Sequence, residues 1–317
     1  MSQSNECKKE CFKSKIGGQA LIEGVYMRGI DTAAMACRLP DGTIDVEQWS
    51  VPKAPWYRKV PFIRGCINFV SNLVEGIRCT MKSAQKQVDA EDNEEEELSK
   101  FEQWLTDKFG DKLVNAVMII SVVIALAFAL IVFKGGPVLI ANLLIKMGAP
   151  ESIRSGAEGL IRLALVVGYM YVISFMGSIK TTFMYHGAEH KSIACYEAQE
   201  ELTVENVRKH TRFHPRCGTS FILIVLIISV IVGIFLPRGN MWVRFGIQML
   251  CLIPESSIAY EIIKIAGRYD NVLTKIISAP GLWLQRITTK EPTDKQIEVA
   301  IAALTPCLPK EGDIDQW

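Results

Sequence analysis

Three long runs of apolar residues divide the chain. Val114 to Phe133 has no charged residue, and Ser220 to Leu236 is a second uncharged run rich in Ile, Val and Leu. Gly159 to Gly177 is the third run, and its Arg162 stands near one end, where a long side chain can reach the membrane interface. Each run has about the length that a helix needs to cross a bilayer. The pattern predicts three membrane-spanning helices.

A fourth apolar stretch is shorter and contains a proline. It runs from Phe245 to Pro254 and is followed by Glu255. Because proline removes a backbone donor and bends a helix, we interpret 245–265 as one broken helix, with a re-entrant or interfacial segment as the alternative. Pro137 to Ile145 is too short to span and is expected on the far membrane surface. These elements indicate a mainly α-helical integral membrane protein with three or four transmembrane helices.

The region before the first apolar run has a different pattern. Ala20 to Met27 is expected as a strand, and Pro40-Asp41-Gly42-Thr43 predicts a hairpin between Met35–Leu39 and Ile44–Trp49. Pro61 to Val88 has apolar residues at helical spacing, which favours a helix that covers this sheet over one that lies on the inner leaflet. We therefore expect a small α+β domain here.

The arrangement of charge divides the chain further. We expect a disordered N-terminus at 1–15, the α+β cytoplasmic domain at 16–88, an acidic linker at 89–100, a transmembrane domain at 101–268 with a histidine loop at 178–219, and a cytoplasmic tail at 269–317. Lys and Arg are concentrated in the N-terminal region, the histidine loop and the tail. The positive-inside rule then places both termini and the histidine loop on the cytoplasmic side of the cell membrane. The first fifteen residues are polar and predict no signal peptide.

All four histidines fall within 29 residues. His186-Gly187-Ala188-Glu189-His190 has the form H-x-x-E-H, the inverted form of a metalloprotease motif. On a helix, residues three and four apart share a face, so both imidazoles and the carboxylate point the same way. Zinc is the metal that such ligands favour, and a catalytic site adds a third protein ligand and keeps one position for water. Glu189 is then the expected base.

Several residues compete for the remaining ligand positions. His214 and Cys217 are expected at a turn, because Pro215 disfavours helix at the residue before it. His210 is a weaker candidate. Either Glu255 or Glu261 could return to the metal as a distal acidic ligand.

The histidine window has three interpretations. The first is a catalytic centre of His186, His190 and a third ligand. The second is a closed structural zinc site of His186, His190, His214 and Cys217. The third has no metal, and the histidines cap helix ends and contact lipid phosphates. Transport is weakly supported, because the clear apolar helices show no charged pair, and no basic-aromatic stripe indicates a nucleic-acid partner.

The sequence contains four notable blocks: Gly17–Gly29, His186–Ile193 with Tyr196-Glu197, His214–Phe221 and Pro280–Thr289. Together they resemble the YqhQ-like family of bacterial multi-pass membrane proteins. The family is described as metal-dependent enzymes, and its reaction is not established. Tyr26 replaces a methionine expected in the opening block. The resemblance implies a multi-pass membrane protein with a metal site.

Taken together, these patterns predict a zinc-dependent membrane hydrolase, with peptide or amide substrates favoured over lipid-linked ones. Arg216 would steady a developing oxyanion beside Glu189. The bilayer and an unidentified protein or peptide are the expected partners. The alternative is a non-catalytic membrane scaffold with a structural His/Cys zinc site. The opening block, with Glu23 and Arg28, is expected either to hold a buried ion pair or solvent-facing residues, or to dock beside the histidine loop.

Overall fold

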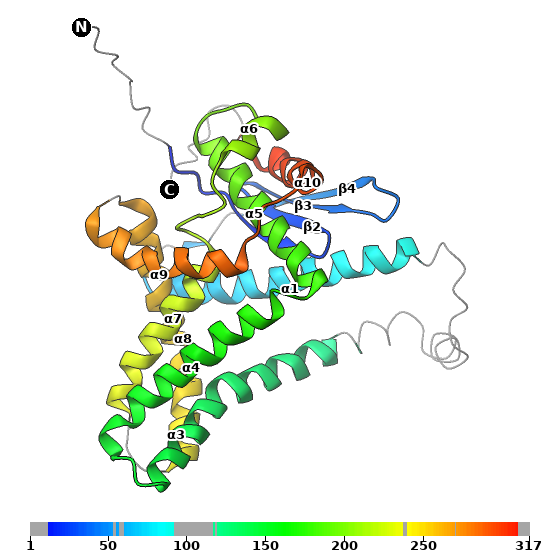
Figure 1. The fold of residues 1–317 in the computed structure, drawn as a ribbon. Coiled ribbons are helices and arrows are strands. Elements are labelled where there is room, and N and C mark those ends of the chain that lie inside the picture. Colours follow the sequence, from blue (N-terminus) through cyan, green and yellow to red (C-terminus); the bar gives the residue numbers. More distant parts are fainter. Residues whose placement is uncertain are drawn as a thin grey trace, which may run out of the picture.

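A small sheet covered by helices lies next to a bundle of longer helices (Figure 1). The computed structural model describes residues 12–52, 55–56, 60–91, 117, 119–236, 240–269 and 271–309. Cys7, Cys11 and most of the expected acidic linker lie outside these residues. Four strands and the helices around them form the upper part of the view, and the apolar helices form the lower part.

The sheet is a four-stranded antiparallel meander, β1-β2-β3-β4. Its strands are β1 Gly17–Leu21, β2 Gly24–Arg28, β3 Thr32–Arg38 and β4 Ile44–Ser50. The predicted hairpin is confirmed, since Arg38 pairs with Ile44 across its turn. The single strand expected at Ala20–Met27 is wrong. A tight turn divides it, and Glu23 takes a φ of 47° there.

Helix α1 (Ile63–Glu91) confirms the predicted helix and has two neighbours. Its C-terminal half covers the sheet, where Cys79 packs with Leu21 and Met35. Its N-terminal half lies against helix α8 (Met241–Arg268), where Asn68 donates a hydrogen bond of 2.9 Å to the Tyr260 hydroxyl. The helix therefore connects the sheet to the bundle.

Among the described residues, three helices are long and apolar enough to cross a membrane. The first, Ile119–Lys146, contains a π-helical turn η2 (Ile131–Gly135) and ends as α3 (Gly136–Lys146). Pro137 to Ile145, expected as a short stretch on the far membrane surface, forms the C-terminal part of this candidate span. Pro137 lies just after the π-helical turn, an irregularity that accommodates a residue without an N–H, so the helix continues through it. The second candidate is Glu151–Ile173, comprising η3 (Glu151–Ile153) and α4 (Arg154–Ile173), and the third is α7 (Gly218–Phe235).

Helix α8 runs through Pro254 without interruption, so the single helix expected over 245–265 is present but the expected break is not. It is not among the three candidate spans. Helix α9 (Val272–Thr288) packs against α7 and α8 with its polar side, including Ser278 and Gln285. Its apolar side chains Ile276 and Trp283 are exposed. This helix has the reverse polarity of a water-soluble surface helix.

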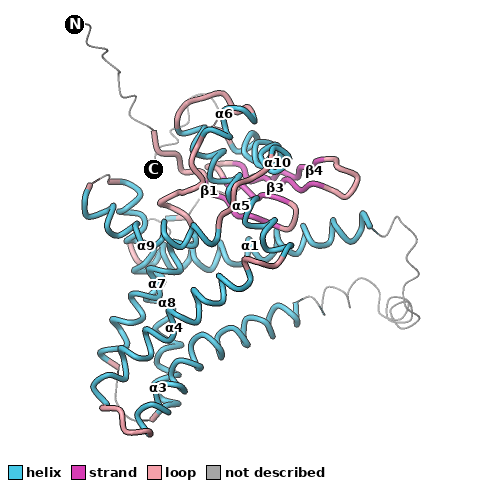
Figure 2. Tube along the Cα trace, viewed as in Figure 1, coloured by secondary structure: helices cyan, strands magenta, loops and turns pink. Residues whose placement is uncertain are grey.

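The sheet shares its core with helices from distant parts of the sequence (Figure 2). Helix α5 (Gly177–Glu197) and α10 (Asp294–Leu304) both pack on β2. The short α6 (Val204–Lys209) lies against both of these helices, and η4 (Thr305–Cys307) follows α10. The region expected as a C-terminal tail thus forms α9 and α10. Its buried Ile297 and Leu304 join the same core as Met27.

Candidate metal centre

Helix α5 carries the H-x-x-E-H motif where it is most deeply buried. Residues 187 to 193 are all buried, because the sheet and α10 pack against this part of the helix. Gly187 permits the approach of the chain after α9, since a Cβ there would lie 2.1 Å from the Lys290 carbonyl oxygen. The rings of His186 and His190 lie one turn apart on one face, with centroids separated by 4.4 Å.

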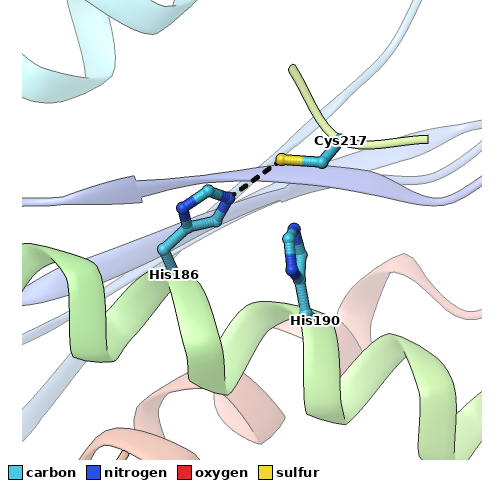
Figure 3. Close-up of side chains that lie close together, drawn as sticks. All are labelled: His186, His190 and Cys217. Atoms are coloured by element: carbon cyan, nitrogen blue, oxygen red, sulfur yellow. Dashed lines mark hydrogen bonds between the residues drawn. The ribbon is translucent and has the colours of Figure 1, made fainter. Parts of the chain in front are cut away.

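Cys217 faces these two rings from the start of α7 (Figure 3). Its sulfur lies 3.1 Å from Nε2 of His186. One ligand atom from each of His186, His190 and Cys217 lies within 4.8 Å of the other two. The turn predicted around Pro215 is confirmed, and it brings Cys217 back toward α5. Two imidazoles and one thiolate are a donor set that suits zinc.

Backbone carbonyls fix the orientation of both rings. Nδ1 of His186 lies 2.8 Å from the Thr288 oxygen, and Nδ1 of His190 lies 2.6 Å from the Arg212 oxygen. A carbonyl only accepts, so each Nδ1 donates its proton to it. This leaves Nε2 as the coordinating atom of each ring, the arrangement found around metal-bound histidines.

The charges of the three groups depend on one another. Burial acts to raise the pKa of Cys217, but the two imidazoles outweigh it and hold that pKa well below its usual range. Burial acts to lower the pKa of His186, but the Cys217 thiolate outweighs it and raises the pKa to about 9. Without a metal, the centre therefore favours a thiolate beside an imidazolium. The backbone N–H of Thr219 points to the same sulfur at 3.4 Å.

Glu189 lies beside this group and is 4 % exposed. Its Oε2 is buried and has no hydrogen-bond partner among the described residues. Burial is the main cause that raises its pKa, and a hydrogen bond from the backbone of Gly18 opposes the shift. A Cβ at Gly18 would lie 2.9 Å from Oε1. Strand β1 therefore packs directly on the carboxylate, which agrees with the docking expected for the opening block.

Glu23 and Arg28 of the opening block have different surroundings. Tyr185 donates a hydrogen bond of 3.1 Å to Glu23. No ion pair joins Glu23 to Arg28 in the part of the chain that the structure describes.

His214 and Arg216 lie near the centre in other roles. The His214 ring is 5.4 Å from that of His190, and its Nε2 accepts a hydrogen bond from Arg216 at 3.1 Å. Burial, followed by the charge of Arg216, holds the pKa of His214 well below its usual range. Arg216 also pairs with Glu197 and donates to the Ser14 carbonyl. It thus anchors the segment before β1.

The structure does not bring the remaining candidates to this group. Glu261 pairs with Arg64 at the start of α1 and accepts from the Phe62 backbone, because α1 lies against this part of α8. Glu255 pairs with Lys134 inside the bundle. His210 lies 3.2 Å from Glu200 and belongs to a separate cluster with Cys195.

Sequence reasoning missed the residues that hold the centre in place. The Gln285 side chain accepts from the His214 backbone N–H at 2.8 Å and donates to its carbonyl at 2.7 Å. Thr288 supplies the carbonyl for His186. Both belong to the last of the four blocks of family resemblance, so that block was the available signal.

The fold and this centre define a helix-rich protein with three candidate membrane spans and a buried His/Cys cluster. The chain belongs to the family described as "Protein of unknown function (DUF1385)", whose profile matches residues 60–310. It is 34 % identical over 305 residues to "Uncharacterized protein YqhQ" of Bacillus subtilis (strain 168), covering 95 % of this chain and 94 % of that protein. The resemblance seen in the four blocks is thereby confirmed. No solved structure matches.

Proposed function

We propose that the protein is a metal-dependent membrane hydrolase with its centre at His186, His190 and Cys217. The observation that carries the proposal is the convergence of three ligand atoms within 4.8 Å beside a buried carboxylate whose Oε2 has no partner among the residues that the structure describes. Buried polar atoms are nearly always satisfied, so an unpartnered one indicates a missing ligand or water. The donor set fits zinc.

Each residue has a defined task in this proposal. The two Nε2 atoms and the Cys217 thiolate would hold the ion, while Thr288 and Arg212 keep the rings oriented. A zinc ion bound there supplies Lewis-acid polarisation and lowers the pKa of water. Glu189 accepts and returns a proton at Oε2, and the Gly18 N–H holds its other oxygen. Arg216 keeps Glu197 and the N-terminal segment in place and is a positioning residue.

The substrate that we propose is a peptide or amide presented at the membrane surface. Cys217 is the N-cap of α7, one of the three apolar helices, so the centre sits at one end of a candidate span. We further propose that the helices insert in the cell membrane, with α5 and both termini on the cytoplasmic side. The excess of Lys and Arg in these regions supports this orientation.

A membrane scaffold with a structural zinc site is the second candidate. The burial of His190 at 2 % and Cys217 at 7 % exposure favours it, because structural sites are closed and catalytic ones keep an open position. In cobalt-substituted protein, azide should change the visible absorption of an open site and leave that of a closed site unchanged.

Metal content tests the proposal first. Elemental analysis of protein purified in detergent should give about one zinc per chain, and His186→Ala and His190→Ala should each lose it. His210→Ala is the matched control, because this imidazole lies in the other cluster and its loss should leave the zinc in place. Wild-type protein that stays metal-free after reloading with zinc would sink the proposal.

The variant Glu189→Gln tests whether Glu189 acts as a general base or as a metal ligand. We expect this variant to keep its metal and to lose turnover on the peptide and amide substrates that the wild type cleaves. Loss of the metal itself would make Glu189 a ligand and would remove its assignment as base.

Orientation is tested by labelling. A membrane-impermeant maleimide added to intact cells should react with Gly148→Cys, in the turn after α3, and with Glu200→Cys only after lysis. The reverse pattern would overturn the proposed orientation.

A further inference from the structure

The helix bundle contains a continuous chain of buried polar side chains, which we call the bundle network. Lys134 lies 3.2 Å from Glu255 and 3.1 Å from Ser229. Ser229 also accepts from Arg162 at 2.8 Å. Arg162 also donates to Gln248 at 2.6 Å, and Gln248 donates to Glu158 at 3.0 Å. Arg244 donates to the same carboxylate at 2.8 Å. All seven side chains are buried, so the expectation of no charged pair within the helices does not hold.

The bundle network has unequal numbers of positive and negative groups. Glu158 is paired by Arg244, and Glu255 is paired by Lys134. Within the described part of the chain, Arg162 donates hydrogen bonds to neutral acceptors alone, namely Ser229, Gln248 and the Phe133 carbonyl. Three cations thus face two carboxylates. A charge without a counterion is costly in a low-dielectric interior, and ionisable groups at membrane depth usually mark a functional site.

Two irregularities in the helices meet at this network. Lys134 lies within the π-helical turn of the first apolar helix, and the Phe133 carbonyl of that turn accepts from Arg162 at 3.2 Å. In α8, Pro254 directly precedes Glu255. Such π-turns are frequent at functional sites, and a proline inside a helix leaves a backbone carbonyl without its usual helical partner.

We propose that the bundle network is a binding site for a singly charged phosphate group, with Arg162 and Lys134 as its cationic contacts. Guanidinium and ammonium groups favour oxyanions, and one negative charge would balance the three cations and two carboxylates. The group could belong to a lipid phosphodiester or to free phosphate, since both present the same oxygens.

A cavity of about 260 Å³ at the far end of the bundle reaches the network. Its lining includes Arg154, Ser155 and Arg244. Arg244 faces the cavity and also donates to Glu158, so the cavity is in contact with the polar chain. This end of the bundle lies opposite the end at which Cys217 begins α7 (Figure 1). The cavity meets the bundle network at Arg244, and neither Arg162 nor Lys134 lines it.

Phosphate binding to full-length protein tests this proposal. In detergent, the wild type should bind about one inorganic phosphate per chain by equilibrium dialysis, or retain one phosphatidylglycerol in native mass spectra. The first result identifies free phosphate and the second a lipid headgroup. Arg162→Gln should weaken either interaction at least about tenfold, as expected for the loss of a charged hydrogen-bonding partner.

Two further variants keep the test decisive. Lys134→Met also removes the excess charge and should weaken binding, so it replaces Arg162→Gln if that variant fails to fold. Arg208→Gln removes an exposed arginine of α6 and should bind like the wild type. A wild type with neither bound phosphate nor retained lipid overturns the proposal, as does undiminished binding by both network variants.

Discussion

The candidate metal centre and the bundle network are both buried and polar, but the chain builds them in different ways. His186 and His190 come from one turn of α5, and Cys217 follows 27 residues later. The bundle network takes isolated residues from four helices, and Lys134 and Glu255 are 121 residues apart. The first cluster has a local spacing that can be recognised. The second exists only once the helices have packed.

The two regions also satisfy their polar atoms differently. At the metal centre, carbonyl groups hold one nitrogen of each imidazole, and the Glu189 Oε2 remains without a described partner. In the bundle network, each side chain forms a hydrogen bond with the next one. What is unbalanced there is the number of positive and negative charges. A missing hydrogen bond and a missing charge are separate signs of an absent ligand. The comparison therefore predicts that the two regions respond independently to substitution.

Glu158→Leu should have the largest effect on stability. It leaves Arg244 buried without its carboxylate, and breaking a buried pair in this way costs about 3–5 kcal/mol. Denaturant titration of the protein in detergent measures the decrease in the free energy of unfolding. The folded fraction should keep the metal content of the wild type, and loss of metal from that fraction would contradict the independence of the two regions.

Gly18→Ala should have an intermediate effect centred on the metal site. The added Cβ would lie 2.6 Å from the Tyr26 carbonyl oxygen and 2.9 Å from the Glu189 carboxylate, so we expect a loss of about 1–3 kcal/mol. Gly17→Ala is the matched control, because its Cβ meets nothing within 4 Å. Denaturant midpoints compare the two, and equal midpoints would show that β1 does not constrain Glu189.

Gln285→Ala tests the support behind the centre. It removes both side-chain hydrogen bonds to the buried backbone of His214, and one unsatisfied group costs about 1–3 kcal/mol. We expect the variant to have a lower melting temperature than the wild type. Phosphate or lipid binding at the bundle network should remain unchanged, and a parallel loss there would show that α9 couples the two regions.

Arg208→Ala should have the smallest effect. Arg208 pairs with Asp294, and more than half of each side chain is exposed. Exposed pairs contribute about 0–1 kcal/mol, so the midpoint should stay close to that of the wild type. A larger decrease would mean that the contact between α6 and α10 limits the stability of the sheet domain.

The sequence predicted the apolar helices, the hairpin and the histidine pair because each has a short-range signature. The period of apolar residues is visible in α1, and proline sets the turn before Cys217. Other features depend on packing. Backbone carbonyls hold the rings of His186 and His190. Because every residue has a backbone carbonyl, the sequence does not reveal which ones accept from these rings. Glu261 could not be placed, because its neighbour Arg64 is brought to it by another helix.

Helix α9 has a consequence for any purified preparation. Its Ile276 and Trp283 are exposed, and we expect an amphiphile to cover them, while Gln285 and Thr288 on its other side hold parts of the candidate metal centre. We therefore expect the amphiphile around α9 to influence the position of the residues that support the centre. A change in surfactant chain length or packing would alter the seating of α9. Metal affinity measured in micelles is then a property of the protein together with its surfactant shell.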